Sequence, residues 1–352
     1  MTTATTPTQQ TVASETMFAT EDRSKDGLTR LPPHTVGRVA ASLRELQQLS
    51  ITPPRETTTG NGLVAPLADS INWGQHLLGI PTVWAKSQGK GVTVAILDTG
   101  CDLKHQDLAD AIVDVADFTN SGSAIDEDGH GTHCAGIVGA RANDAGFVGV
   151  APDCDLLIGK VLSGGTGTWE GIVAGIDWAR EYRAHIISMS LGGSYNHPDV
   201  YSAIHTALAD GIIVICAAGN SGAMHRNSIG YPGRDGAVIT VAAHNSSGIA
   251  ADFSSHGGEV DFMTPGVDIW STYKNGSYAT LSGTSMATPF VAGISALVLS
   301  KHFATPSSET PVKNTADMVE HLSRMATHPG WHDNTSGYGV LKPLTYFSEM
   351  TN

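Results

Sequence analysis

The chain has 352 residues, of which 41% are hydrophobic and 40 are glycines, a composition typical of one large globular domain with an extension and not of a fibrous or disordered protein. Its formal net charge is −14, with 34 acidic against 20 basic residues, so nucleic acid and anionic membranes are not expected partners. No stretch approaches about 18 uninterrupted apolar residues, so no membrane span is expected either.

The first 65 residues differ in composition from the rest. They begin with a Thr-rich tail that lacks the charged-then-apolar run of a secretory signal. Apolar residues at helical spacing from Val36 to Leu49 predict one amphipathic helix, and Pro53, Pro54 and Gly60 mark a linker. We therefore expect residues 1–65 to be an N-terminal extension and residues 66–352 to be the main domain.

Cysteine usage points to the compartment. The four cysteines form no C-x-x-C pair and most lie beside apolar runs, which favours buried, reduced thiols over disulfides. Together with the leader composition, this predicts a cytoplasmic protein, with secretion as the alternative if a signal was removed.

From residue 92 onward, short apolar runs alternate with helical stretches. This alternation predicts an α/β fold of three layers, a mainly parallel central sheet flanked by helices. The predicted strands are residues 92–97, 156–161, 186–189, 211–217 and 238–243. The predicted helices are residues 130–142, 169–181, 199–210 and 285–302, the last apolar almost all round and therefore central.

Asp98 follows the first predicted strand, in the sequence VAILDTG. The carboxyl ends of parallel strands are where α/β sheets place their sites, so this carboxylate could orient a base. A turn-forming Asp is the structural alternative. The D-T-G of aspartic proteases is another, but those enzymes need two such carboxylates in one site, and no second D-[ST]-G occurs in the chain.

His130 opens a predicted helix in the sequence DGHGTHCAG. Glycines on both sides leave the imidazole accessible. His133 lies three residues later, which raises zinc binding as an alternative, but the H-E-x-x-H arrangement of metalloproteases is absent. With 15 histidines in the chain, His130 alone is weak evidence.

Ser285 lies at the start of the apolar helix, where unpaired N–H groups and the helix dipole stabilise negative charge. Simple helix capping is the alternative. Ala287 rules out the G-x-S-x-G elbow of α/β-hydrolases. Asn220 follows another predicted strand, and its amide could donate to an oxyanion or merely form a turn.

Taken together, the motifs VAILDTG, DGHGTHCAG, ISMSLGG, CAAGN, YPG and SGTSMATPFVAG resemble those of the subtilase family, in family order, from about residue 73 to about residue 341. The wording is most similar to bacterial intracellular subtilisins, and HGTHC is also similar to proteinase K. The resemblance implies a serine endopeptidase in which Ser285 is the nucleophile, His130 the general base and Asp98 its orienting carboxylate. Asn220 would then donate to the oxyanion.

The resemblance also implies a cleft for extended polypeptide substrates. Ser190, Leu191 and Gly192 match the segment that pairs with substrate backbone, and Gly219 matches the wall of the P1 pocket. Trp169 would cover an apolar subsite, with a core tryptophan as the alternative. We expect broad preference for apolar or aromatic P1 residues. A catalytically idle binding module and a processing protease of narrow specificity are the competing functions.

Calcium is the ion that the resemblance implies, because oxygen ligands suit Ca²⁺. The implied ligands are the side chains of Asp107 and Asn143 and the carbonyls of Arg141, Ala145 and Phe147. Ala68 stands where the family has an amide side chain, and Asp69 could substitute for it. Solvated surface carboxylates are the alternative.

The N-terminal extension precedes the domain as an inhibitor would. The sequence LPPH at residues 31–34 resembles the proline-bearing segment with which intracellular subtilisins block their own cleft, and proline resists strand pairing. Residues 1–65 are therefore predicted to be a short propeptide or inhibitory segment. A disordered leader is the alternative.

Overall fold

The computed structural model describes residues 49–50, 68–223, 225–305 and 311–349. The chain divides into two units, Met1–Glu45 and Leu46–Asn352, and the first lies wholly outside the described residues. The predicted linker also lies outside them. So does the predicted helix over residues 36–49, except for its last residue: Leu49 lies in a strand, β1 (Leu49–Ser50), because its backbone pairs with another strand.

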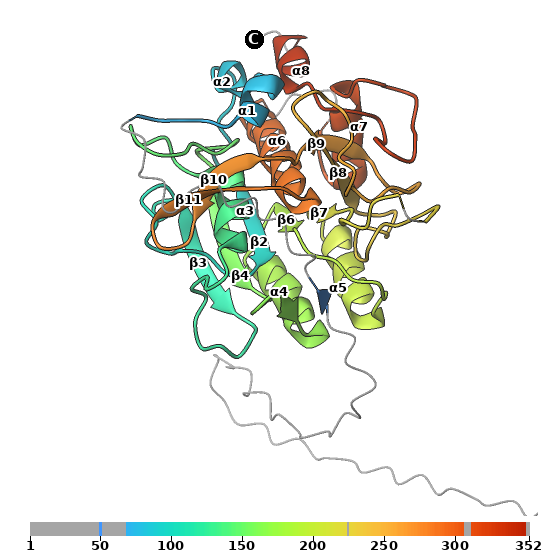
Figure 1. Ribbon diagram of the computed structural model, residues 1–352. Helices are drawn as coiled ribbons and strands as arrows, with labels where there is room; N and C mark the ends of the chain where they lie inside the picture. Colours follow the sequence, from blue (N-terminus) through green and yellow to red (C-terminus); the bar gives the residue numbers. More distant parts are fainter. Residues whose placement is uncertain (1–48, 51–67, 224, 306–310, 350–352) are drawn as a thin grey trace, which may run out of the picture. The chain divides into compact units, whose positions relative to one another are not determined.

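A seven-stranded, all-parallel sheet forms the centre of the larger unit (Figure 1). In spatial order its strands are β3 (Ile112–Asp117), β4 (Asp155–Lys160), β2 (Thr93–Asp98), β6 (Ile186–Met189), β7 (Ile213–Ala217), β8 (Ile239–His244) and β9 (Phe262–Pro265). Five of these strands confirm the prediction to within two residues at each end. The two edge strands, β3 and β9, were not predicted, because Asp114 and Asp117 interrupt the apolar run of β3 and β9 includes Thr264 and Pro265.

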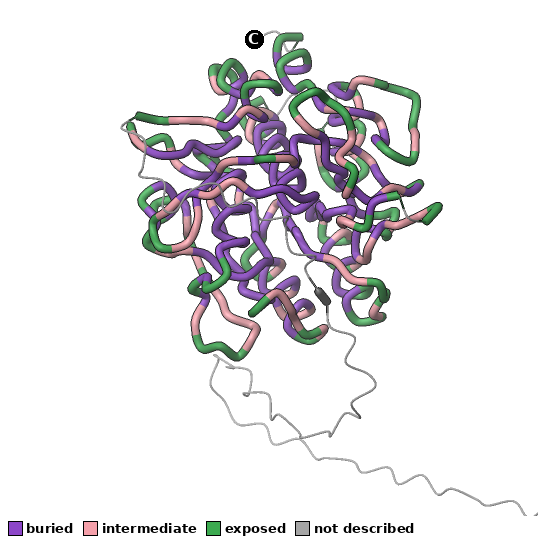
Figure 2. Tube along the Cα trace, viewed as in Figure 1, coloured by how far each residue is buried: buried purple, intermediate pink, exposed green. Residues whose placement is uncertain are grey.

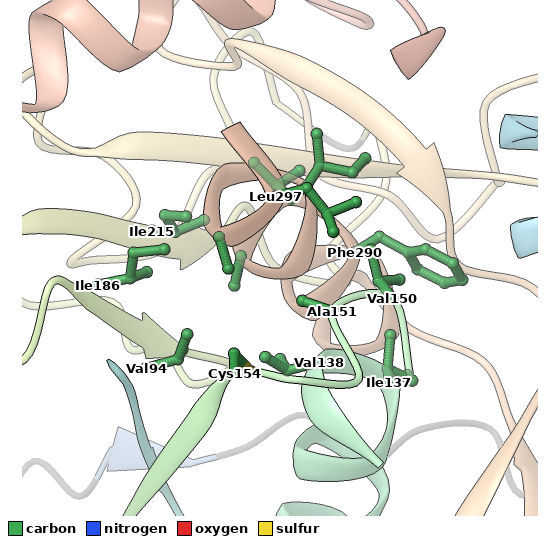
Figure 3. Close-up of a cluster of buried hydrophobic side chains, with 14 of the residues drawn as sticks. Val94, Ile137, Val138, Val150, Ala151, Cys154, Ile186, Ile215, Phe290 and Leu297 are labelled. Carbon is green, nitrogen blue, oxygen red and sulfur yellow. The ribbon is translucent and has the colours of Figure 1, made fainter. Parts of the chain in front are cut away.

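Helices cover both faces of this sheet. α3 (His130–Gly139) and α6 (Thr284–Ala304) lie on one face, and α4 (Trp169–Glu181) and α5 (Pro198–Ala209) on the other. Alternate residues of each strand enter the two cores: Val94 packs with the α3 and α6 side, whereas Ala95 packs with the α4 and α5 side. Figure 3 shows part of the first core. This is the expected three-layer fold.

α6 is buried along most of its length (Figure 2). It is the one helix in the described part of the chain that is long and apolar enough to cross a membrane, but 83% of that apolar window is buried inside the protein. Burial of each large aliphatic or aromatic side chain stabilises the fold by about 1.5–3 kcal/mol. Its apolar residues are thus accounted for by core packing.

Smaller elements complete the unit. They are α1 (Trp73–Leu78), α2 (Ile80–Val83), β5 (Thr166–Gly167), β10 (Ile269–Tyr273), β11 (Ser277–Leu281), α7 (Thr315–Arg324) and α8 (Pro343–Glu349). β10 and β11 form an antiparallel hairpin that fixes α3, since Ser271 Oγ and Thr272 Oγ1 donate to the carbonyls of His133 and Thr132. β1 pairs antiparallel with β5.

The order of the strands decides where the site forms. β2 lies between β4 and β6, so the direction of chain progression across the sheet reverses at β2. Ligands bind at such switch points, beyond the carboxyl ends of the strands. Asp98 is the last residue of β2, and the segments after β6 and β7 leave the sheet at the same edge.

Candidate active site

Asp98 and His130 form a buried pair. His130 is the first residue of α3, and its Nδ1 lies 2.7 Å from Asp98 Oδ1 at the end of β2. The side chains are only 2% and 1% exposed. Asp98 Oδ1 also accepts from the Thr99 N–H at 2.7 Å, which fixes the carboxylate. Since an ionised carboxylate can only accept, the imidazole donates from Nδ1 and its Nε2 is left as an acceptor.

This environment raises the proton affinity of His130. Burial by itself lowers the pKa of an imidazole, but the adjacent Asp98 charge and hydrogen bond outweigh burial and hold the pKa of His130 well above its usual value. His130 Nε2 is buried and has no hydrogen-bond partner among the residues that the structure describes. It is therefore a basic nitrogen available to take a proton.

His133 does not join this pair. Its Nε2 lies 3.0 Å from the Ile269 carbonyl and 3.2 Å from the Ala279 carbonyl, on the β10–β11 hairpin. Burial lowers the pKa of His133 to about 3, so it is a neutral structural histidine. The cluster of ligating atoms within 4.8 Å found among the described residues is instead Asp98, His130 and Cys134, where Nδ1 is already bonded to the carboxylate.

Ser285 lies in the first turn of α6, and Cys134 lies between it and His130. Cys134 Sγ lies 3.9 Å from His130 Nδ1 and 3.4 Å from the Ser285 carbonyl, so imidazole and serine backbone flank one thiol. Ser285 Oγ donates to the Ser190 carbonyl at 3.2 Å and makes no recorded hydrogen bond to His130. Rotation about the Cα–Cβ bond of Ser285 is needed to redirect the hydroxyl.

Pro289 explains how the Ser285 carbonyl is available for these contacts. In an α-helix this carbonyl would accept from the N–H four residues later, and proline at that position has none. Ser190 Oγ donates to the freed carbonyl at 2.9 Å, and Cys134 Sγ approaches it at 3.4 Å. The proline in the SMATPF sequence thereby ties the Ser285 backbone to the segment after β6.

Two hydrogen bonds from Thr284 to Asn220 Oδ1 fix the orientation of the Asn220 amide. Its Oδ1 accepts from the backbone N–H of Thr284 at 3.0 Å and from Thr284 Oγ1 at 3.1 Å. Within the described part of the chain, the Nδ2 group of this half-buried amide has no hydrogen-bond acceptor, and Asn220 and Ser285 line the same cavity. An amide so fixed can donate to negative charge that develops beside Ser285.

That cavity has a volume of about 360 Å³. Its walls include the expected substrate-binding residues Ser190, Leu191, Gly192 and Gly219. Gly219 has φ of 105°, and a Cβ there would lie 3.2 Å from Ser255 Oγ, so glycine is required. Sequence reasoning missed two basic residues that also line it, Arg234 and His225; no Asp or Glu is among its described lining residues.

Trp169 lies in a neighbouring cluster of rings at the start of α4. It stacks on His197 with ring centroids 5.0 Å apart and 14° between planes, and Tyr195 packs edge-on at 6.2 Å. Leu191 lines both this cluster and the cavity beside Ser285. Trp169 is half-buried.

Two of the expected calcium ligands, the side chains of Asp107 and Asn143, lie side by side. Asp107 is fully buried, and its carboxylate accepts from the Phe147 N–H and from Tyr278 Oη, both at 2.8 Å. Asn143 Nδ2 lies 3.4 Å from Asp107 Oδ1, and the Asn143 N–H donates to Asp69 Oδ1 at 3.2 Å. Within the described part of the chain this buried carboxylate has neutral donors and no ion pair. Asn143 turns its Nδ2 towards Asp107, and its Oδ1 accepts from the Ala145 N–H at 3.3 Å. The carboxylates of Asp107 and Asp69 are the oxygen ligands here that suit a cation.

Comparison with known proteins identifies the family of the chain. The model of the subtilase family (peptidase S8) matches residues 89–339. The chain is 47% identical over 291 residues to an intracellular serine protease of Paenibacillus polymyxa, which covers 80% of this chain and 88% of that protein. It is 42% identical over 267 residues to subtilisin DY of Bacillus licheniformis, covering 75% and 94%.

A third relative is more distant but nearly as fully covered. Thermitase of Thermoactinomyces vulgaris is 38% identical over 257 residues, covering 72% of this chain and 91% of that protein. These relatives are proteases, and the chain covers most of the length of each. The chain belongs to the subtilase family and is a serine endopeptidase.

Proposed function

We propose that Asp98, His130 and Ser285 are the catalytic triad and that Asn220 donates to the oxyanion.

His130 Nε2 takes the proton of Ser285 Oγ as that oxygen bonds to the substrate carbonyl carbon. Asn220 Nδ2 and the Ser285 N–H hold the resulting O⁻. The tetrahedral intermediate collapses when His130 gives its proton to the leaving nitrogen. A water then attacks the acyl-enzyme by the same proton route. The observation that carries the proposal is the buried Asp98–His130 pair, which is linked to the Ser285 carbonyl through the Cys134 thiol between them.

The substrate is proposed to bind as an extended segment along Ser190, Leu191 and Gly192, beside the cavity. The P1 side chain enters that cavity, whose volume suits apolar and aromatic residues. Trp169 would cover a second apolar subsite next to Leu191. Arg234 adds a positive charge to the P1 wall and extends the expected range to acidic residues.

A peptidase assay tests the triad. Ser285→Ala and phenylmethylsulfonyl fluoride should each abolish turnover of a chromogenic peptide, because both remove the nucleophile while leaving the fold intact. Ser300→Ala, a serine near the other end of α6 whose hydroxyl bonds the Lys90 carbonyl, is the matched control and should stay active. Turnover by Ser285→Ala equal to that of the control would contradict the assignment.

We further propose that Asp107, Asn143 and the Arg141, Ala145 and Phe147 carbonyls hold a structural Ca²⁺. Asp69 would add a second carboxylate where Ala68 supplies none. When bound, the ion would cross-link the loop before β3 to the loop after α3 and neutralise the buried Asp107. The buried carboxylate without an ion pair among the described residues supports this site.

We propose that the N-terminal extension inhibits the peptidase of its own chain by occupying part of the substrate cleft. Its one described segment, β1, pairs with β5 through Leu49↔Gly167 and Ser50↔Thr166, immediately before Trp169. A strand at this position would compete with an extended substrate for the same backbone edge. The proposed cytoplasmic location is supported by relatives named as intracellular proteases.

A further inference from the structure

Asp126 is a buried carboxylate that the proposed triad does not use. Its side chain is 3% exposed and accepts five hydrogen bonds. Oδ1 accepts from Thr99 Oγ1 at 2.9 Å, the Asp128 N–H at 3.0 Å and the Gly129 N–H at 2.8 Å. Oδ2 accepts from the Thr132 N–H at 2.8 Å and Thr132 Oγ1 at 2.6 Å. Such a group costs several kcal/mol to desolvate, and these bonds offset that cost.

The donors to Asp126 belong to the two segments that carry the Asp98–His130 pair. Thr99 directly follows Asp98, whereas Gly129 and Thr132 flank His130. Thr99 Oγ1 also accepts from the Gly131 N–H at 2.8 Å, which adds a direct bond between the segments. Asp126 therefore joins the end of β2 to the start of α3, and the relative position of these two segments sets the distance between His130 Nδ1 and Asp98 Oδ1.

The start of α3 depends on this carboxylate. Gly129 is the N-cap, has φ of 106° and offers no side chain to cap the helix. A side chain cannot be added there, because a Cβ would lie 2.3 Å from the Tyr273 ring. Asp126 takes over capping by accepting from the Thr132 N–H, and its negative charge at a helix N-terminus is favourable. His130 is the first helical residue, so its backbone position follows that of the capped turn.

We propose that Asp126 is a positioning residue for the peptidase reaction: it holds the end of β2 and the first turn of α3 in the register that keeps His130 Nδ1 bonded to Asp98. It touches neither substrate nor reacting atoms. The proposal rests on the proposed triad, and its consequences differ from those of losing a triad member.

Asp126→Asn tests it. The amide keeps the shape of the side chain but replaces one acceptor oxygen with an NH₂ that faces existing donors. We expect kcat to fall roughly 10- to 100-fold, as for a small misplacement of a catalytic group, with KM changed less than about two-fold. In the variant the contact between Asp98 and His130 is looser, so the pKa of His130 is raised less than in the wild type. The acidic limb of the pH profile of kcat/KM should therefore move to lower pH.

Thr99 provides a second, milder test if Asp126→Asn folds poorly. Thr99→Val removes the hydroxyl that links Asp126 to the Gly131 N–H and should lower kcat in the same direction. Thr99→Ser keeps the hydroxyl and should restore kcat and the pH profile towards those of the wild type.

Asp117→Asn is the matched control. Asp117 also accepts five hydrogen bonds, from Thr119 N–H and Oγ1, Ser121 Oγ, Gly122 N–H and Ser123 N–H, but it closes the loop after edge strand β3. This variant should lose stability without a change in kcat per active site. Active-site titration counts the folded fraction in every variant, so that kcat is not confused with yield.

Two results would overturn the proposal. The first is that Asp126→Asn and Thr99→Val both keep the wild-type kcat per titrated active site and the wild-type acidic limb in the pH profile of kcat/KM. The other is a fall in kcat that Asp117→Asn reproduces. Ser285→Ala tests the triad separately. Full activity of Ser285→Ala would refute the triad. If Ser285→Ala is inactive but Asp126→Asn and Thr99→Val behave like the wild type, only the positioning role is refuted.

Discussion

At the residue scale, the properties of His130 depend on its neighbours. Burial disfavours the imidazolium, and Asp98 favours it more strongly, so the pKa of His130 lies well above its ordinary value. The imidazolium that forms during acylation is stabilised in the same way. The cost is that the free enzyme must be titrated to a higher pH before the base is neutral.

This predicts the pH dependence of activity. A general base acts only when unprotonated, so kcat/KM should fall as the pH drops through the raised pKa of His130, above about 6.5. In Asp98→Asn the largest cause of the raised pKa, the Asp98 charge, is lost and only the smaller contribution of Cys134 still opposes burial, so the acidic limb should move to lower pH while kcat falls by about 10⁴. Initial rates of peptide hydrolysis from pH 5 to 10 measure both effects. A limb that stays in place in Asp98→Asn would show that Asp98 does not set the pKa.

Arg234 makes a second prediction at this scale. It is an exposed cation that lines the cavity beside Ser285, the proposed P1 pocket, and lies 5.9 Å from the centroid of the Tyr231 ring. Arg234→Ala should lower kcat/KM for a P1 Glu substrate several-fold, consistent with up to about 1 kcal/mol for a solvent-exposed ion pair. The kcat/KM for the matched P1 Phe substrate should stay nearly constant.

The salt dependence supplies the control for Arg234. The preference of the wild type for P1 Glu should weaken at high ionic strength because the interacting charges are partly solvated. Arg226→Ala, which removes an arginine that is not among the lining residues of the cavity, should leave the Glu-to-Phe ratio unchanged. An equal fall in both variants would refute a specific contact at Arg234.

At the element scale, the loop before β3 and the loop after α3 are joined through Asp107. Its oxygens accept from Phe147 and Tyr278, and Asn143 lies beside it. These elements are far apart along the chain, and the proposed ion would add ligands from each. Binding to the folded state alone stabilises it in proportion to RT ln(1 + [L]/Kd).

Calcium removal should therefore lower the melting temperature. We expect EGTA to destabilise the wild type by several degrees, since about 1–3 kcal/mol shifts the Tm of a domain of this size by roughly 2–4 °C per kcal/mol. Asp107→Asn should melt lower than the wild type and be insensitive to EGTA. Asp110→Asn, an exposed carboxylate of the same loop, is the control and should respond like the wild type. Equal melting curves with and without EGTA would exclude the site.

At the scale of the whole molecule, the N-terminal extension and the main domain meet in one described contact, the β1–β5 pair. The pair uses backbone groups, so it resembles substrate binding and carries little sequence specificity. Because β1 belongs to the same chain as β5, its covalent attachment favours pairing in cis over pairing between molecules.

Removal of the extension should activate the enzyme. A shortened chain that begins at Pro66 is expected to show a lower KM than the full chain, with a similar kcat, because a competing strand has been removed. A synthetic peptide of residues 41–56 should inhibit the shortened chain competitively. A shortened chain no more active than the full one, with equal folded fractions, would refute self-inhibition.

The sequence by itself determined the fold class, five of the seven central strands and the long helices over residues 169–181, 199–210 and 285–302, because apolar runs and helical periodicity are local signals. It also singled out Asp98, His130, Asn220 and Ser285, since each lies at a strand end or helix start. The helix from His130 ends at Gly139, three residues before the predicted end.

Only the tertiary structure decided what those residues contact. The β10–β11 hairpin, the edge strands and the terminal helices α7 and α8 gave weak local patterns and are fixed by packing on other elements. The roles of Asp126 and Arg234 arise from segments that meet in space, and no spacing along the chain encodes them. Hydrogen bonds between distant segments depend on atomic positions, whereas a motif specifies only the order of residues.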